Sequence, residues 1–213
     1  MSDDPNARQG LRLLRRYRAA TLAFGDRRAH VQFVFSPATG RIVMPVGSDA
    51  AALDEFTLYL PTESDCDATA LLIPARIERP EAEESVDRWL AYHGLPPGGC
   101  AWTSSRVLGI KSTADSGDAV MDEAALTVAN PLGRSEFGVI RAANADRPRL
   151  TRAVHAITGA SVSGALCVGV DELGIDIRAP FGIVRIEFPA AAADAAAAEA
   201  MLREHILARG DAA

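Results

Sequence analysis

The stretch Gly169-Val170-Asp171-Glu172-Leu173-Gly174-Ile175-Asp176-Ile177-Arg178 has the pattern of a tight β-hairpin. A β-prone run lies on each side of a short turn at Asp171-Glu172-Leu173, which is typical of two antiparallel strands. A third apolar run, from Gly182 to Phe188, follows a second turn at Ala179-Pro180-Phe181. We therefore expect a three-stranded antiparallel sheet from strands at 164–170, 174–178 and 182–188.

Helical patterns flank this sheet on both sides. One run ends near Ala143 after Ser135, and a second spans about Arg147 to Thr158, where Gly159 stops it. Pro189 is expected to open a final alanine-rich helix that reaches Arg209, because alanine favours helix and proline suits a first turn. Residues 126–213 are thus predicted to form one small α/β domain.

The first part of the chain has a different pattern. A helix with a basic face is expected over 6–20, and residues 80–93 suit a second helix, inserted late. Six short β-prone runs predict a small antiparallel barrel within residues 1–125. The runs are 21–24, 30–35, 41–46, 56–60, 69–77 and 102–111, the last turning at Asp115-Ser116-Gly117.

Composition excludes several classes of protein. The formal charge is −6, which argues against broad nucleic-acid binding despite the local basic cluster Arg12, Arg15, Arg16 and Arg18. The three cysteines are widely spaced and outline neither a disulfide framework nor a zinc site. The polar start and the lack of a long apolar run predict no signal peptide and no membrane span, so a cytoplasmic location is expected.

Three segments carry a resemblance to a known family. Asn144-Ala145-Asp146-Arg147, the hairpin 169–178 and Arg185-Ile186-Glu187-Phe188-Pro189 resemble, in order and spacing, the small C-terminal domain of haem-utilisation proteins. That domain is fused to a split β-barrel of the FMN-binding, pyridoxamine phosphate oxidase-like kind. The resemblance implies an α+β fold, a split β-barrel followed by the small α/β domain (helix, three-stranded antiparallel sheet, helix), a homodimer, and haem or a flavin as ligand.

Two positions depart from the family pattern. Arg147 stands where the family's helix usually begins with a histidine that is a candidate for iron. In flavin-binding relatives a Ser or Thr with a nearby cation holds the phosphate after the third strand, whereas Ser48 here has Asp49 beside it. A phosphate would be repelled at that position.

Histidines and arginines are the candidate haem contacts, because iron accepts imidazole and propionates pair with guanidinium groups. His155 and His205 are expected on the first and last helices of the C-terminal domain, and we predict them as iron ligands. Arg147 and Arg178 are predicted as propionate or distal contacts. The alternative is that the two histidines are surface or packed residues.

Two further groups have competing interpretations. Trp89 and His93 share a helix face, where they either stack on a cofactor or pack onto the barrel. Asp171, Asp176 and Arg185, with Arg178, either anchor a substrate or form turn and cross-strand contacts. We favour the structural interpretation for both groups.

Three functions follow from these observations. The first is binding of haem or a related tetrapyrrole for trafficking, storage or degradation. The second is a regulatory scaffold without a cofactor, which binds another protein. The third is a flavin-dependent oxidoreductase. No catalytic motif for a nucleophile, zinc or a nucleotide occurs, so the sequence does not decide whether the protein is an enzyme.

Overall fold

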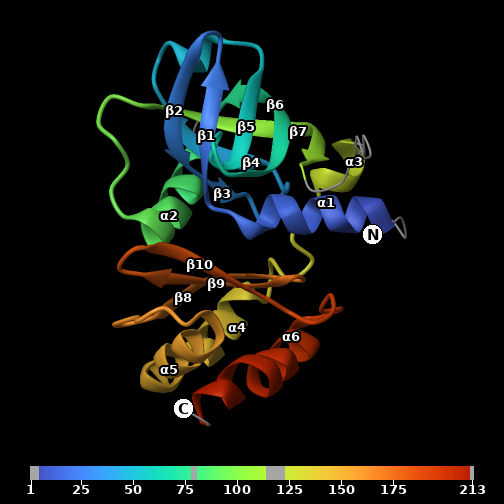
Figure 1. Ribbon diagram of the computed structural model, residues 1–213, viewed down its shortest axis with the longest axis vertical. Helices are drawn as coiled ribbons and strands as arrows, with labels where there is room; N and C mark the ends of the chain where they lie inside the picture. The colour runs from blue at the N-terminus through green and yellow to red at the C-terminus, as the bar shows by residue number, and fades with distance from the viewer. Residues whose placement is uncertain (1–4, 78–80, 114–122, 212–213) are drawn as a thin grey trace. The chain divides into compact units, whose positions relative to one another are not determined.

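The computed structural model describes residues 5–77, 81–113 and 123–211 of the chain. Its contacts divide the chain into two compact units, Met1–Ala129 and Asn130–Ala213. The first contains a curled seven-stranded sheet and the second a three-stranded sheet with helices (Figure 1). The fold is therefore α+β.

The seven strands of the first unit form one antiparallel sheet in the order β2-β1-β5-β6-β7-β4-β3. The sheet curls into a half-barrel around a single apolar core (Figure 1). Its strands are β1 Ala19–Phe24, β2 Arg27–Gln32, β3 Val34–Phe35, β4 Ile42–Val46, β5 Phe56–Pro61, β6 Cys66–Arg76 and β7 Ala101–Ser112.

One bent segment of chain connects the two ends of this sheet. β2 pairs with β1 at one end, and β3 follows after the single residue Phe33 and pairs with β4 at the other. Phe33 is fully buried at the bend, and its amide donates to the carbonyl of Arg18 at 3.0 Å. Its carbonyl lies 3.1 Å from Nε2 of His93, so both backbone groups of the bend are satisfied.

Helices cover the curled sheet. α1 (Pro5–Arg16) contacts β6, β7 and the short α3 (Glu123–Leu126), while α2 (Glu81–His93) contacts β3 and is followed by Gly94. The first helix was expected to reach Ala20 but ends at Arg16, because buried Ala20 joins the β1 ladder opposite Val31.

β2 starts earlier than the sequence predicts. β2 begins at Arg27 rather than at His30, because a tight turn at Gly25, where φ is +55°, pairs the charged residues Arg27 and Arg28 with β1. Charged side chains are tolerated there because that part of the strand is exposed. The expected turn at Asp115-Ser116-Gly117 lies outside the described residues.

The second unit places helices against one face of its sheet, as Figure 1 shows. The three predicted strands are confirmed, as β8 (Leu166–Asp171), β9 (Gly174–Ala179) and β10 (Gly182–Glu187), in the order β10-β9-β8. α4 (Glu136–Ala143) and α5 (Arg147–Thr158) precede them. Gly159 ends α5 with a φ of +70°, as expected.

The last helix differs from its prediction. α6 (Ala195–Met201) begins six residues after Pro189, where Asp194 accepts a hydrogen bond from the amide of Ala197 at 2.8 Å. The preceding segment is held by the amide of Ala192, which donates to the carbonyl of Glu172 at 2.7 Å. The helical path continues as a π turn, η2 (Leu202–Ile206), and a 3-10 turn, η3 (Leu207–Gly210).

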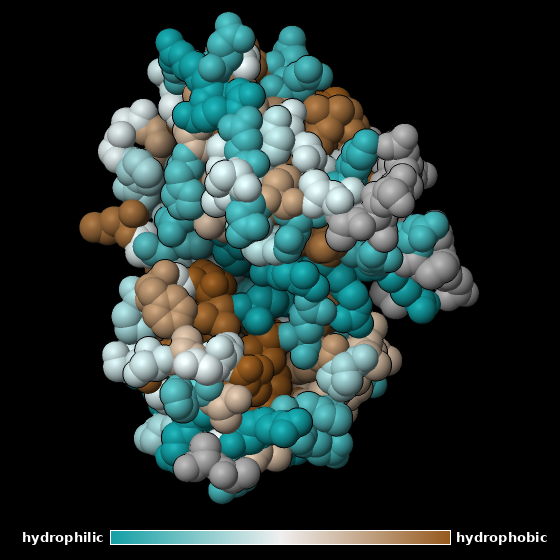
Figure 2. All heavy atoms as spheres, viewed as in Figure 1, coloured by the Kyte–Doolittle hydropathy of each residue, from teal (hydrophilic) through white to brown (hydrophobic). Residues whose placement is uncertain are grey.

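Exposed apolar side chains on the seven-stranded unit are scattered. Leu53, Leu71, Leu90 and Leu95 are exposed, and Figure 2 shows brown atoms of this unit as separate spots on the face drawn. Single exposed leucines are common on protein surfaces. Among the described residues, no helix combines the length and the apolar character that crossing a bilayer requires.

Gly40 is predicted to be essential for the stability of the first unit. Its φ is +72°, and an added Cβ would lie 2.2 Å from the carbonyl oxygen of Val128. Gly40→Ala therefore combines backbone strain with a clash against backbone, and should cost more than about 2 kcal/mol in urea denaturation.

The matched control is Gly25→Ala, where φ is also positive but nothing lies within 4 Å of an added Cβ. This variant should lose only about 1 kcal/mol, from backbone strain alone. Equal losses for the two variants would contradict the packing of Gly40 against Val128.

Candidate ligand cleft

A cleft of about 360 Å³ opens in the first unit, where the two ends of the curled sheet approach each other. β2 contacts β4, yet among the described residues no backbone hydrogen bond joins these strands. We call this gap the seam. The lining of the cleft comes from β1, β2, β4, η1 (Ala50–Ala52) and the loop before β7. The lining residues are Leu22, Phe24, Ala29, His30, Val31, Pro45, Val46, Gly47, Asp49, Ala50, Pro97, Gly98, Gly99 and Cys100.

The seam stays open for a local reason. β3 pairs only with Ile42 and Val43, so the later part of β4 has no partner on that side. Pro45 in that part has no N–H and cannot donate to a strand beside it. The cleft therefore forms where the bent segment leaves β4 and follows β1.

The walls of the cleft are largely apolar. Leu22, Val31, Val46 and Ala50 are buried and form its floor. His30 is exposed and Cys100 is half-buried. An apolar site with a few polar groups is the usual composition of a small-molecule site.

The side chains of His30 and Cys100 have no hydrogen-bond partner among the described residues, unlike those of His93 and Cys66. His93 is bound to a backbone carbonyl, and Cys66 donates to the carbonyl of Ala68 at 3.2 Å. Cys167 is buried, and desolvation followed by the nearby Asp176 carboxylate raises the pKa of its thiol. Among the described residues that line the cleft, His30 and Cys100 are thus the side chains of a metal-binding type that have no hydrogen-bond partner.

Asp49 contributes the only carboxylate among the described lining residues. One of its oxygens accepts from the amide of Ala50 at 3.0 Å, and the other pairs with Arg27. The same carboxylate lies against Gly47, where an added Cβ would be 2.7 Å from Oδ1. Negative charge therefore already occupies this loop, which is unfavourable for a phosphate.

The described side chains also limit which metals the protein could hold. Within the described ranges, His, Cys, Asp and Glu side chains form no group of three or more that could hold a metal ion. A bare ion such as zinc needs about four protein ligands, whereas the porphyrin of haem supplies four nitrogens and leaves one or two positions for protein. One imidazole and one thiol are therefore too few to hold a bare ion, whereas a single protein ligand can suffice for haem.

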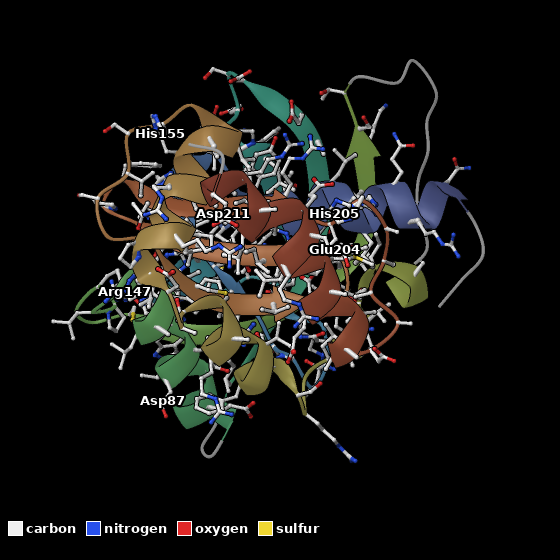
Figure 3. All side chains as sticks on the ribbon, turned by 90° about the horizontal axis from the view of Figure 1, so that it is seen from below. Asp87, Arg147, His155, Glu204, His205 and Asp211 are labelled. Atoms are coloured by element: carbon white, nitrogen blue, oxygen red, sulfur yellow. The ribbon has the colours of Figure 1, made fainter. Side chains whose placement is uncertain are left out.

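The predicted haem contacts lie in the second unit and do not line the cleft. His155 and His205 are both exposed, on α5 and η2, and Figure 3 shows them on separate helices without pointing toward each other. Nδ1 of His155 lies 2.9 Å from the carbonyl of Ala160. Arg147 is exposed at the start of α5, and Arg178 is partly buried in β9. Their assignment as haem contacts stays a prediction.

The segment that begins the family resemblance stabilises the end of α4 and the edge of β8. The amide group of Asn144 donates to the carbonyl of Cys167 at 2.8 Å and accepts from the amide of Cys167 at 2.9 Å. It thereby replaces a neighbouring strand at that edge. Asp146 caps α5 by accepting from the amide of Arg149 at 3.0 Å.

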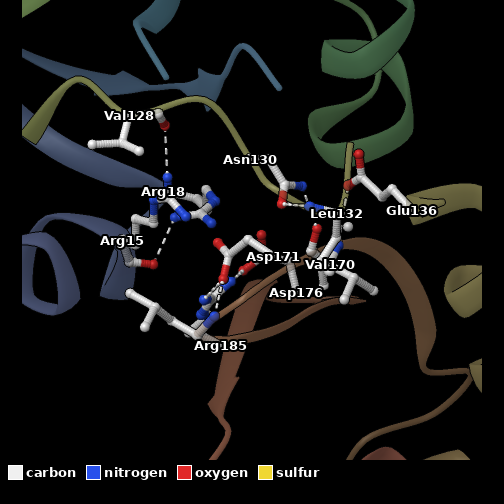
Figure 4. Close-up of polar contacts among 12 residues, drawn as sticks. Arg15, Arg18, Val128, Asn130, Leu132, Glu136, Val170, Asp171, Asp176 and Arg185 are labelled. Carbon is white, nitrogen blue, oxygen red and sulfur yellow. Dashed lines mark hydrogen bonds and ion pairs between the residues drawn. The ribbon is translucent and has the colours of Figure 1, made fainter. Parts of the chain in front are cut away.

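Farther along the same edge, Asn130 and Glu136 bind the backbone of Val170 (Figure 4). Nδ2 of Asn130 donates to the carbonyl at 2.8 Å, and Oε1 of Glu136 accepts from the amide at 3.1 Å. The edge strand is thus covered by side chains at two points.

A buried charge cluster crosses the three-stranded sheet (Figure 4). Arg185 on β10 pairs with Asp171, and with Asp176 at 3.3 Å, in direct cross-strand register with the latter. Asp171 also accepts from the amide of Leu173 at 2.8 Å and so fixes the turn. The interpretation of these residues as turn and cross-strand contacts is confirmed for Asp171, Asp176 and Arg185.

The aromatic face of α2 packs against the sheet of the first unit. Trp89 is buried, and its ring centroid lies 5.6 Å from that of Trp102 and 4.5 Å from that of His93. With His93 bound to the bend at Phe33, this face attaches the helix to the sheet. The packed interpretation of Trp89 and His93 is confirmed.

Comparison with known proteins gives a fold but no family. No family model matches the sequence, and no curated protein matches it. The solved structure of Atu2129, a protein of unknown function from Agrobacterium tumefaciens, matches with a TM-score of 0.68 at 17% identity, covering 96% of each chain. The similarity to it shows that the whole α+β chain has a counterpart among solved structures.

A haem-binding protein from Mycobacterium smegmatis matches with a TM-score of only 0.44, at 20% identity, covering 100% of this chain and 98% of the other. A similarity of that size supports no argument about this protein.

The structural importance of Asn144 is open to a direct test. In Asn144→Ala the amide and carbonyl of Cys167 each lose a partner, and this should cost about 1–3 kcal/mol in free energy of unfolding. Arg147→Ala, three residues away and exposed, is the control and should change stability by less than about 0.5 kcal/mol. Urea denaturation of both variants measures the free energy of unfolding. A value for Asn144→Ala equal to that of the native protein would contradict the role of Asn144 in covering the edge of β8.

Proposed function

We propose that this protein binds haem or a related tetrapyrrole in the cleft at the seam, for trafficking, storage or degradation. The observation that carries the proposal is the cleft itself, since apolar walls and an uncommitted histidine line one opening between two ends of a sheet. The C-terminal resemblance to haem-utilisation proteins points to the same ligand class.

Within this proposal, His30 is the first candidate for the axial ligand. It lies on the wall of the cleft formed by β2, opposite Thr21 of β1 in the ladder, and no described residue holds its ring. A neutral imidazole nitrogen is a good ligand for haem iron. His155 and His205 remain the alternatives in the second unit.

The size of the cleft favours partial burial of the ligand. A volume of about 360 Å³ is near the lower end of small-molecule sites, so one edge of a porphyrin would enter and the other would extend outward. No Arg or Lys is among the lining residues described. The described lining thus offers no cation to the propionates, which would have to be solvated by water.

A flavin is a weaker candidate for the same opening. FMN carries a phosphate, and the loop after β4 places the Asp49 carboxylate in the cleft, with its own backbone and Arg27 contacts already made. Bringing a phosphate beside a carboxylate is unfavourable. A cofactor-free scaffold remains the alternative if no tetrapyrrole binds.

An absorbance titration of the full chain with hemin tests the proposal. We expect a saturable shift of the Soret band for the native protein, and an affinity loss of about tenfold or more in His30→Ala, because one iron ligand is removed. The readout is the dissociation constant of each variant.

His155→Ala and His205→Ala are the matched controls, since both histidines are exposed, as His30 is. They should bind hemin like the native protein. Loss of binding in either would move the site to the second unit, and the absence of any Soret shift in the native protein would refute haem binding.

A further inference from the structure

One ion pair crosses the seam. Arg27, the first residue of β2, pairs with the carboxylate of Asp49 in the loop between β4 and η1. Among the described residues, no other ion pair or hydrogen bond links β2 with the segment from β4 to η1. Apart from this ion pair, the two described walls of the seam therefore meet only through van der Waals contacts.

The Asp49 side of the pair is held in place by its own loop. Oδ1 of Asp49 accepts from the amide of Ala50 at 3.0 Å, and the amide of Ala51 donates to the carbonyl of Gly47 at 2.9 Å. A Cβ added at Gly47 would lie 2.7 Å from Oδ1, so the carboxylate packs directly against this glycine. The loop thus fixes one carboxylate oxygen and leaves Oδ2 for Arg27.

The Arg27 side of the pair lies at the tip of the β1–β2 hairpin. Because side chains alternate along a strand, Arg27 shares a face of β2 with Ala29 and Val31, which line the cleft. The tip residues Gly25 and Asp26 are exposed, and nothing lies within 4 Å of a Cβ added at Gly25. Open space therefore surrounds the hairpin tip, and Arg27 is the partner that can move away.

The exposure of the ion pair limits its strength. The side chains of Arg27 and Asp49 are 69% and 53% exposed. Exposed ion pairs contribute little and are screened by salt, so the loss of this pair changes an opening equilibrium by about two- to fivefold. Such a contact is too weak to hold the fold together, but it can break and re-form while the fold stays intact.

We propose that the Arg27–Asp49 pair is a latch on the seam, which keeps the cleft narrow when it is closed and breaks to admit a ligand. The cleft of about 360 Å³ is near the lower end of small-molecule sites. No described backbone hydrogen bond has to break for the walls to separate, so opening costs the ion pair and local apolar contacts. Ligand admission rests on the proposed function, whereas opening of the seam does not.

Alkylation of a thiol introduced in the floor of the cleft measures the opening. Val31 is buried and lines the cleft, so the thiol of Val31→Cys should react with iodoacetamide when the seam opens. The reporter is combined with Arg27→Gln, with Asp49→Asn, which keeps an oxygen for the amide of Ala50, and with both. We expect each single variant to react about two- to fivefold faster, and the double variant no faster than either, because the two residues act as one pair.

Two controls separate the latch from a general loss of stability. Arg28→Gln removes the neighbouring ion pair, in which Nε of Arg28 lies 3.1 Å from both carboxylate oxygens of Glu63, and should leave the rate of the Val31→Cys reporter unchanged. Ala70→Cys places a thiol in the same core away from the cleft, and this thiol should react equally slowly with and without the latch. Salt at about 1 M should accelerate the Val31→Cys reporter in the native background but not in the double variant.

An unchanged rate for the Val31→Cys reporter in both single variants, or rate increases that add in the double variant, overturns the latch. Stopped-flow mixing with hemin, in chains without the reporter, then tests admission of the ligand. The double variant should develop the Soret shift about two- to fivefold faster than the native protein.

The failures of the two proposals are distinguishable. A faster reporter with an unchanged rate of hemin association overturns the role of the latch in ligand entry. A faster reporter with no Soret shift in any variant overturns haem as the ligand and leaves the latch on the seam standing.

Discussion

The site depends on one constraint, which is that the seven-stranded sheet does not close on itself by hydrogen bonds. A closed barrel requires every strand to pair on both sides. Here the segment from β2 to β3 bends at Phe33 and divides its pairing between β1 and β4. The later part of β4 and the middle of β2 then face each other without a ladder, and the cleft opens between them.

Several independent contacts hold the bend at Phe33, and for this reason the seam has a fixed position. The phenyl ring is fully buried, and Arg18 and His93 satisfy the two backbone groups. His93 is in turn held by its contacts with Trp89 on α2. A histidine and a tryptophan that the sequence offers as a possible cofactor surface thus act on the site indirectly, by fixing the strand that bears His30.

Much of the fold could be predicted from the sequence because it depends on local signals. The hairpin through Asp171 and Gly174 follows from its β-prone runs and turn residues, and both neighbouring strands lie within two residues of their expected bounds. The predicted start of the last helix was wrong, because Asp194, and not Pro189, lies at the N-terminus of that helix and caps it. In that case a side-chain hydrogen bond outweighs the preference of proline for a first turn.

The candidate site was harder to predict because it depends on contacts distant in sequence. His30 and Cys100 are 70 positions apart and belong to no motif, so only the curl of the sheet brings them to one opening. The segment at Asn144 gave a clear signal, yet its Asn and Asp perform structural tasks, covering a strand edge and capping a helix. A recognisable pattern therefore did not point to the cleft, which lies elsewhere in the chain.

Paramagnetic broadening in a two-dimensional amide spectrum tests the central claim, that the seam is the ligand site. Ferric haem added to the labelled full chain broadens amide signals close to the iron. The account predicts loss of signals from residues 29–31, 46–50 and 98–101, with the exposed turns of α5 and η2 unaffected. Broadening confined to residues around His155 or His205 would contradict it.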